Sequence, residues 1–326
     1  MSEKLNNVKY RFLPISESVS KGLERETKIT DFEVLKELGS GSFGNVYLVR
    51  HKETKAEYAI KAIEKRYKIN EDNNPYFIRE VEVMYKINHP NLVKFYGHFE
   101  DNNYCYFIME YLSKGNLYGI IPSDKKKKIK LKVCASIIKD VICAIYFLHN
   151  IKPPIIHRDI KPENVLLSEG LIVKLADFGW SNFVREEETM KTIKNVCPDH
   201  LAPEIFEEKR QNEAVDIWCI GILLFKLITA TVPFQGTDID TLKGNILKLK
   251  IKWPKDIDAD AKNLIIERLK LDSKQRLSLE DMLKHPFISK YIPDATKYLI
   301  KLEEGVQYKP FIVSKDNPKT WKPKKI

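Results

Sequence analysis

Short alternating runs of apolar and polar residues fill the first third of the chain. They are FEVLKELG, GNVYLVR, AEYAIKAI, NLVKFYGHFED and YCYFIMEYL, and each has the two-residue period of a strand. Segment 76–87 differs, because its apolar residues recur at helical spacing. A turn is expected at 101–103, between the last two runs. The pattern predicts a mostly antiparallel β unit that carries one helix.

After Gly115 the apolar stripes become longer and helical. They predict helices at 131–150, 214–230, 258–271 and 278–288, the last one capped by Ser278. A β unit joined to a helical unit by one extended segment leaves a cleft, which is a natural ligand site. The longest apolar run, IWCIGILLF, is far shorter than the roughly 20 residues of a membrane helix. We therefore expect no membrane span and, since the N-terminus lacks an apolar signal core, an intracellular protein.

Composition adds little to this picture. Hydrophobic residues make up 43% of the 326 residues, which is enough for a full core. The five cysteines form no CxxC pair, so we predict neither disulfides nor a zinc site. Cys197 alone falls in a loop pattern, and the others are expected to be buried.

The net charge of +10 is concentrated in KKKKIK and in the tail NPKTWKPKKI. Solvated lysines on exposed faces are the simplest interpretation. The alternative is that the tail, with Trp321, docks on an acidic partner such as tubulin. No specific nucleic-acid binding is predicted.

A glycine-rich motif, LGSGSFGNV, places Gly39, Gly41 and Gly44 between the first two predicted strands. Glycines let the backbone turn sharply and bring N–H groups close to phosphates. The motif does not open a helix, which argues against a dinucleotide-binding turn. A lysine, Lys61, follows on the next strand, and Glu80 lies on the predicted helix. An ion pair between these two side chains would hold the lysine against nucleotide phosphates, although Glu80 also fits an ordinary exposed carboxylate.

Two acidic motifs, HRDIKPEN and DFG, follow in the helical part. Asp159 can accept the proton of an attacking hydroxyl, and Lys161 can stabilise charge on the transferred group. Asn164 and Asp177 can hold two Mg²⁺ ions that bridge the phosphates. The four motifs occur together in the order and spacing of the protein-kinase signature.

On these motifs, residues 32–288 resemble the eukaryotic protein kinases. KPEN after Asp159 resembles the serine/threonine type, and LADFGWS, with Trp180, resembles the Aurora group. The resemblance implies an α+β, two-lobed kinase fold. Its parts would be an N-terminal extension at 1–31, a small lobe at about 32–112 that is mostly antiparallel β with one helix, a larger and mainly α-helical lobe at about 113–288, and a basic tail at 289–326.

The resemblance also assigns roles to individual residues. Asp159, Lys161, Lys61 and Glu80 would be catalytic, and Asn164 and Asp177 would bind Mg²⁺. ATP would contact Leu38, Gly39, Gly41, Gly44, Val46, Ala59, Lys61, Glu110, Leu112 and Leu166, with Met109 as gatekeeper. Met84, Phe95, His157 and Phe178 match the stacked spine of the family, and Arg276 matches the arginine that pairs with the APE glutamate, Glu204.

Aurora-type kinases phosphorylate Ser or Thr of protein substrates, often with Arg or Lys upstream, on the spindle, centrosome or cilium. The resemblance therefore implies protein substrates, an activating partner protein and microtubule or centrosome association. It also implies a location in the cytoplasm, on the cytoskeleton or in the nucleus.

The segment NVCPDH departs from the Aurora pattern. Asn195 stands where the family has its activating threonine, and asparagine cannot be phosphorylated. Arg158, which binds the activating phosphate in regulated kinases, is nevertheless present. Phosphorylation of Thr189 or Thr192, the acidic run 186–188 or a partner protein could each order the segment. We favour the threonines.

Two classes of function follow. The first is an active serine/threonine kinase, since every residue needed for Mg-ATP and transfer is in place. The second is a nucleotide-binding scaffold of the pseudokinase kind, which would dock partners through the altered segment or the basic tail.

Overall fold

The computed structural model describes residues 27–41, 44–65, 75–123, 128–170, 172–183 and 198–299, with the side chains of 75–79 left out. Thr189, Thr192, Asn195 and Cys197 lie outside this part. The contacts divide the chain into two compact units. Among the described residues, the first unit holds those up to 65 together with 94–111, and the second holds 75–93 and 112–299.

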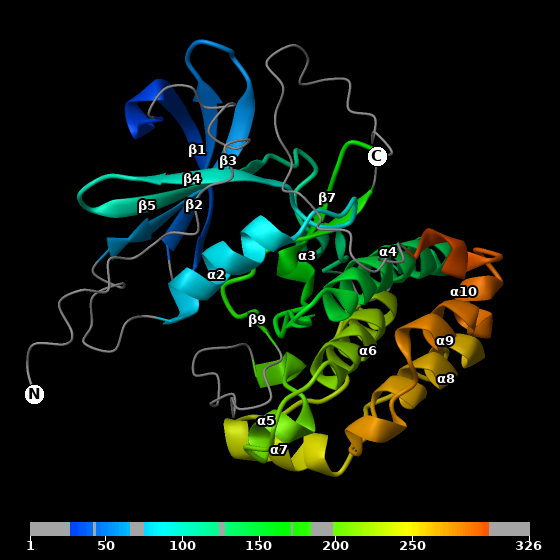
Figure 1. The fold of residues 1–326 in the computed structure, drawn as a ribbon. Helices are drawn as coiled ribbons and strands as arrows, with labels where there is room; N and C mark the ends of the chain where they lie inside the picture. Colours follow the sequence, from blue (N-terminus) through cyan, green and yellow to red (C-terminus); the bar gives the residue numbers. More distant parts are fainter. Residues whose placement is uncertain are drawn as a thin grey trace, which may run out of the picture. The chain divides into compact units, whose positions relative to one another are not determined.

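The first unit is an antiparallel sheet of five strands (Figure 1). The strands are β1 (Phe32–Gly41), β2 (Gly44–His51), β3 (Glu57–Glu64), β4 (Phe95–Glu100) and β5 (Tyr104–Glu110), in the spatial order β1-β2-β3-β5-β4. The predicted turn at 101–103 is present. The carboxylate of Asp101 accepts the N–H groups of Asn103 and Tyr104.

The core of this sheet is a cluster of buried apolar side chains contributed by four strands. Its members are Phe32, Val49, Ile60, Tyr106 and Ile108. In β3, which lies between β2 and β5, three consecutive residues, Ala59 to Lys61, are buried. Since successive side chains point to opposite faces of a sheet, both faces of this strand are covered here. Burial of a lysine this deep is unusual for a side chain without a function.

The second unit is mainly helical (Figure 1). Its helices are α2 (Pro75–Lys86), α3 (Leu117–Ile120), α4 (Leu131–Asn150), α5 (Pro203–Phe206), α6 (Ala214–Thr229), α7 (Ile239–Leu247), α8 (Ala259–Arg268), α9 (Leu279–Lys284) and α10 (Pro286–Ser289). Two short antiparallel pairs complete it: β6 (Ile155–Ile156) with β9 (Asn182–Phe183), and β7 (Val165–Leu167) with β8 (Val173–Leu175). The sheet and the helical unit confirm the predicted α+β, two-lobed class. The one helix expected in the small lobe is α2, but the contacts group it with the helical unit.

Helix α6 lies at the centre of the second unit. It packs against α4 and α8, and it is buried on nearly every side, as its apolar sequence predicts. A β-carbon at Gly221 would approach the Cβ of Arg268 to 2.7 Å, so only glycine permits the close contact between α6 and α8. In the described part of the chain, no helix is both long and apolar enough to cross a bilayer.

One predicted helix is wrong in its extent. Segment 278–288 forms two short helices, α9 and α10, and not one. Ser278 caps α9 as predicted, since its Oγ accepts the N–H of Asp281. The break falls at His285, which is extended (ψ 142°) because the residue before a proline is biased away from the helical conformation. Pro286 then starts α10.

Four of the cysteines are buried with free thiols, as expected: Cys105, Cys134, Cys143 and Cys219. Burial raises the pKa of Cys134 and Cys143 to about 12, so these thiols stay protonated and unreactive.

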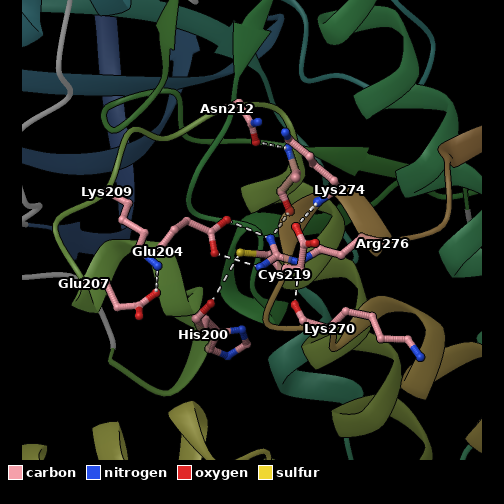
Figure 2. A network of polar contacts seen from close by, with 11 residues as sticks. His200, Glu204, Glu207, Lys209, Asn212, Cys219, Lys270, Lys274 and Arg276 are labelled. Atoms are coloured by element: carbon pink, nitrogen blue, oxygen red, sulfur yellow. Dashed lines mark hydrogen bonds and ion pairs between the residues drawn. The ribbon is translucent and has the colours of Figure 1, made fainter.

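A buried ion pair ties the APE motif to the segment that follows α8 (Figure 2). Both guanidinium nitrogens of Arg276 donate to the two carboxylate oxygens of Glu204 at 2.7 Å, as the family resemblance implied. Arg276 also donates to the carbonyls of Lys270 and Ala214 and lies over the ring of Trp218. Among the described residues, its side chain therefore hydrogen-bonds to α5, to α6 and to the segment that follows α8.

Removal of the Glu204 carboxylate should leave a buried guanidinium without its counter-ion. We expect Glu204→Ala to lower the free energy of unfolding by about 3–5 kcal/mol. Glu207→Ala is a matched control, because Glu207 pairs with Lys209 at 3.0 Å on the surface, and its loss should cost less than about 1 kcal/mol. Urea unfolding followed by tryptophan fluorescence measures both. Equal effects of the two variants would contradict a structural role for the buried pair.

Candidate active site

The HRDIKPEN segment runs between β6 and β7, and a buried carboxylate fixes its backbone. Asp216, near the start of α6, accepts the N–H of His157 at 2.9 Å and the N–H of Arg158 at 2.8 Å. The ring of His149 lies 2.8 Å from the same carboxylate through its Nε2. Three groups from α4 and from the loop thus converge on one acidic side chain.

Asp216 remains charged although it is fully buried. Burial would raise its pKa, but the hydrogen bond with the ring of His149 and the hydrogen bond from the N–H of Arg158 help to outweigh burial and hold the pKa below its usual value. The carboxylate stabilises Arg158 in a left-handed conformation, with φ 67°. Such a conformation is costly for a residue with a β-carbon and persists only where the surroundings enforce it.

Beyond this anchor, Asp159, Lys161 and Asn164 come together as the sequence predicted. Lys161 Nζ lies 2.8 Å from Asp159 Oδ2, and Asn164 Nδ2 donates to the same oxygen at 2.7 Å. Asn164 Nδ2 also donates to the Asp159 carbonyl at 2.8 Å. The second carboxylate oxygen, Oδ1, is buried and accepts no hydrogen bond from the described residues. The carboxylate is therefore oriented through one oxygen, while the other has no donor among the described residues.

The charge of Lys161 is secured by its surroundings. Burial opposes the charged form, but Asp159, Asp177 and Glu163 together outweigh it and raise the pKa of the lysine. Lys161 therefore stays cationic beside the Asp159 carboxylate at neutral pH.

The DFG segment is held against the same loop. Asp177 is also left-handed (φ 63°), and its Oδ1 accepts the N–H of Gly179 at 3.3 Å. Phe178 is buried and meets the ring of His157 edge to face, with centroids 5.0 Å apart. His157 Nε2 lies 3.1 Å from the carbonyl of Ala176, and burial lowers the pKa of its imidazole, so the ring is neutral and packs with Phe178. Met84, another predicted spine residue, is buried in this unit, and Phe95 is buried in the sheet.

Asn164 and Asp177 have the chemistry that Mg²⁺ requires. The nitrogen of the Asn164 amide is occupied by Asp159, which leaves its oxygen as the available ligand atom. The carbonyl of Asn164 accepts the N–H of Ala176 at 2.8 Å, so the two motifs are joined next to Asp177. Hard oxygen ligands, few in number and supplemented by phosphate oxygens, are what Mg²⁺ prefers. The residues present therefore fit the metal.

In the first unit, the predicted phosphate loop is a hairpin between β1 and β2. Gly41 pairs with Gly44 at its end. Gly44 has φ +152°, and a β-carbon there would meet the Ala62 carbonyl oxygen at 2.1 Å, so no other residue fits. The backbone thus comes close to β3 at this point.

The other predicted nucleotide contacts in this unit lie on adjacent strands. Val46 pairs across the ladder with Lys61, and Leu48 pairs with Ala59. Ala59 in turn pairs with Met109, the predicted gatekeeper. Gly39 pairs with Val46, and Leu38 is exposed. The N–H of Glu110 donates to the Lys94 carbonyl at 3.0 Å.

The remaining predicted contacts belong to the second unit. Glu80 is buried on α2, Leu112 is buried just after β5, and Leu166 is half-buried on β7. The exposed-carboxylate interpretation of Glu80 is wrong, because only 5% of the residue is accessible.

Arg158 has a partner that sequence reasoning missed. Its Nε donates to the Trp180 carbonyl at 2.6 Å, and its Nη1 donates to Oε1 of the buried Gln211 at 3.4 Å. Gln211 lies 53 positions from Arg158 in a polar stretch between α5 and α6, and no local pattern distinguishes it. His149, at the end of an amphipathic helix, was missed for the same reason.

The NVCPDH segment is described only from Pro198 onward. Pro198–His200 form a 3₁₀ turn, and Cys219 Sγ on α6 donates to the His200 carbonyl at 3.4 Å (Figure 2). Burial, followed by the charges of Lys226 and Lys161, lowers the pKa of His200 to about 3, so its ring is neutral.

Comparison with known proteins agrees with this geometry. The protein kinase domain model matches residues 32–288. An Aurora kinase of Saccharomyces cerevisiae is 38% identical over 269 residues, which cover 82% of this chain and 72% of that protein. Aurora kinase C of Mus musculus is 35% identical over 263 residues, 81% of this chain and 93% of the mouse protein. Aurora kinase B of the same species is 34% identical over 260 residues, 80% of this chain and 74% of its own length. The chain therefore belongs to the protein kinase family and is a protein serine/threonine kinase close to the Aurora group.

Proposed function

We propose that this chain is catalytically active and transfers the γ-phosphate of Mg-ATP to Ser or Thr hydroxyls of protein substrates. The observation that carries the proposal is the state of Asp159. One carboxylate oxygen is held by Lys161 and Asn164, and the other is buried without a hydrogen-bond donor among the described residues. A buried acceptor without a partner is costly, and a substrate hydroxyl would satisfy it.

Each of the four motif residues in the helical unit then has a proposed role. Asp159 Oδ1 accepts the proton of the substrate hydroxyl, and Lys161 stabilises negative charge beside it. Asn164, through its amide oxygen, and Asp177 would hold Mg²⁺. Bound Mg²⁺ neutralises charge on the phosphates, which is how protein kinases in general use ATP with this metal.

The nucleotide contacts of the first unit follow the family assignment. Gly39, Gly41 and Gly44 would present backbone N–H groups to the phosphates. Lys61 would contact the α- and β-phosphates and pair with Glu80. Each of these two charged residues is buried in its own unit. Since charged side chains are rarely buried without a partner of opposite charge, their burial supports the proposed role. Leu38, Val46, Ala59 and Leu166 would cover the adenine, while the backbone of Glu110 and Leu112 would bond its edge.

Regulation is proposed to use phosphorylation of Thr189 or Thr192, with Arg158 as the phosphate-binding side chain. Arg158 is anchored by hydrogen bonds to the Trp180 carbonyl and to Gln211. The alternative is that a partner protein or the acidic run 186–188 orders the activation segment. By resemblance to the Aurora group, we place the activity in cell division or in microtubule or ciliary regulation, with an intracellular location on the spindle, centrosome, cilium or in the nucleus.

A nucleotide-binding scaffold is the second candidate, and the altered NVCPDH segment favours it. The two candidates differ in transfer and not in binding. An assay with radiolabelled ATP on casein and histone, with Asp177→Ala as the inactive control, separates them. Incorporation that the control abolishes supports the kinase, and tight Mg-ATP binding without incorporation supports the scaffold.

Asp159→Asn should separate transfer from binding. The amide keeps the shape of the side chain and loses the proton acceptor, so kcat should fall by about 10²–10⁴-fold. The Kd of Mg-ATP, measured by calorimetry, should stay within about threefold, since Asn164 and Asp177 remain. Asp256→Asn on the exposed surface is the matched control and should change neither quantity. Full activity of Asp159→Asn would contradict the proposed base.

The double variant Thr189→Ala, Thr192→Ala tests the activation proposal. Loss of one charge-assisted hydrogen bond to Arg158 should lower kcat/KM by about tenfold or more. Gln211→Ala in the same background should lower it further, because Arg158 then loses a neutral anchor as well. Mass spectrometry of an active preparation that finds both threonines unmodified would contradict the proposal.

A further inference from the structure

Lys226 lies beside the catalytic loop, close to the acidic side chain of Glu163. Lys226, in the last turn of α6, places its Nζ 3.9 Å from Oε1 of Glu163. Glu163 lies in the turn Pro162–Asn164, next to the residue proposed to hold Mg²⁺. The ammonium also lies 5.6 Å from the ring centroid of Tyr118 on α3. Lys226 is thus held by a carboxylate and an aromatic face and is not a loose surface lysine.

This pair is electrostatically connected to the reacting group. Lys161 contacts Asp159 directly, and the charge of Glu163 contributes to the raised pKa of Lys161. Lys226 and Lys161 both contribute to the lowered pKa of the buried His200. The five side chains therefore share one small region of the helical unit. A substrate chain that brings a hydroxyl to Asp159 spans about 3.3 Å per residue, so its nearest flanking residues pass through this region.

The state of the Glu163 carboxylate indicates what it can bind there. Its side chain is 40% accessible, so it faces solvent in part. The distance of 3.9 Å to Lys226 is too long for a direct hydrogen bond, and Oε2 is buried without a partner in the described part of the chain. The carboxylate can therefore accept a further donor. Its negative charge, however, is already balanced by Lys226.

We propose that Lys226 is a specificity-determining residue. Its charge removes the preference for basic substrate side chains at the Glu163 carboxylate. The Glu163 carboxylate is then a subsite for uncharged hydrogen-bond donors. A cationic substrate residue would meet the ammonium of Lys226 together with the carboxylate and would gain little. An uncharged donor such as Gln, Asn, Ser or Thr can hydrogen-bond to the partly exposed carboxylate without that repulsion. The inference rests on the proposed function, and it opposes the preference for upstream Arg or Lys that resemblance to the Aurora group implied.

A purely structural role for Lys226 is the competing explanation. A cation near the C-terminus of a helix interacts favourably with the helix dipole. That role would affect the stability of α6 and would leave substrate choice unchanged. The two explanations therefore differ in a measurable ratio of rates.

The test is the phosphorylation of an oriented peptide library by the full chain. Peptides carry one acceptor Ser and differ only in having Arg, Gln or Glu at one of the three positions on either side. For the wild type, the ratio of kcat/KM for Arg over Gln should stay within about threefold at every position. Lys226→Glu should raise that ratio by about tenfold at one position, because a repulsive charge becomes an attractive one.

Two further variants make the result specific. Lys284→Glu is the matched control, since it reverses the charge of another ion-paired lysine, 3.1 Å from Asp281 on the exposed face of α9, and should leave every ratio unchanged. Lys226→Gln, which keeps a polar chain of similar reach, should give an intermediate ratio and covers the case in which Lys226→Glu does not fold.

A wild type that already selects Arg about tenfold or more would overturn the inference, and so would folded Lys226 variants with unchanged ratios. Either result would leave the proposed function intact, because peptides would still be phosphorylated. Absence of phosphorylation with every peptide would instead overturn the proposed function and the inference with it.

Discussion

The buried carboxylate of Asp216 is the constraint on which the catalytic loop depends. It accepts two consecutive backbone N–H groups, from His157 and Arg158, and it lies beside His149 of α4. Those bonds hold Arg158 in a conformation that its β-carbon disfavours, and the bend places Asp159, the next residue, in its orientation. Because the carboxylate sits on the central helix α6, the position of the reacting group is tied to the core of the helical unit.

The segment that departs from the Aurora pattern is bounded by well-anchored structure. Before it, Phe178 packs on His157, and the Trp180 carbonyl accepts a hydrogen bond from Arg158. After it, His200 is tied to α6, and Glu204 is held by Arg276. The change at Asn195 therefore falls between two fixed ends. We propose that it affects activation and substrate docking, while the groups proposed for phosphoryl transfer belong to the anchored parts.

Residues that act through local pattern could be predicted from the sequence. Period and turn signals located the five strands of the sheet and the helices α2, α4, α6 and α8, and Ser278 was identifiable as a cap because its partner is three residues away. The short elements α3, α5, α7 and β6 to β9 were not predicted. The motif residues Asp159, Lys161 and Asn164 were identifiable because they lie within five positions of one another, so a single loop brings them together. Pro286 breaks a helix that apolar spacing alone had predicted to continue. Gln211, His149 and Lys226 act across 53 to 67 positions on otherwise ordinary polar or amphipathic stretches, so only the fold shows their partners.

The central claim is that the open oxygen of Asp159 receives the substrate hydroxyl. A crystal structure of the chain with a non-hydrolysable ATP analogue, Mg²⁺ and a serine peptide tests it most directly. The account predicts the serine Oγ about 2.5–3.0 Å from Asp159 Oδ1, with Mg²⁺ bound by Asn164 and Asp177. A complex in which the nucleotide binds without Mg²⁺, or in which Oδ1 is bonded within the protein and the serine lies elsewhere, would contradict it.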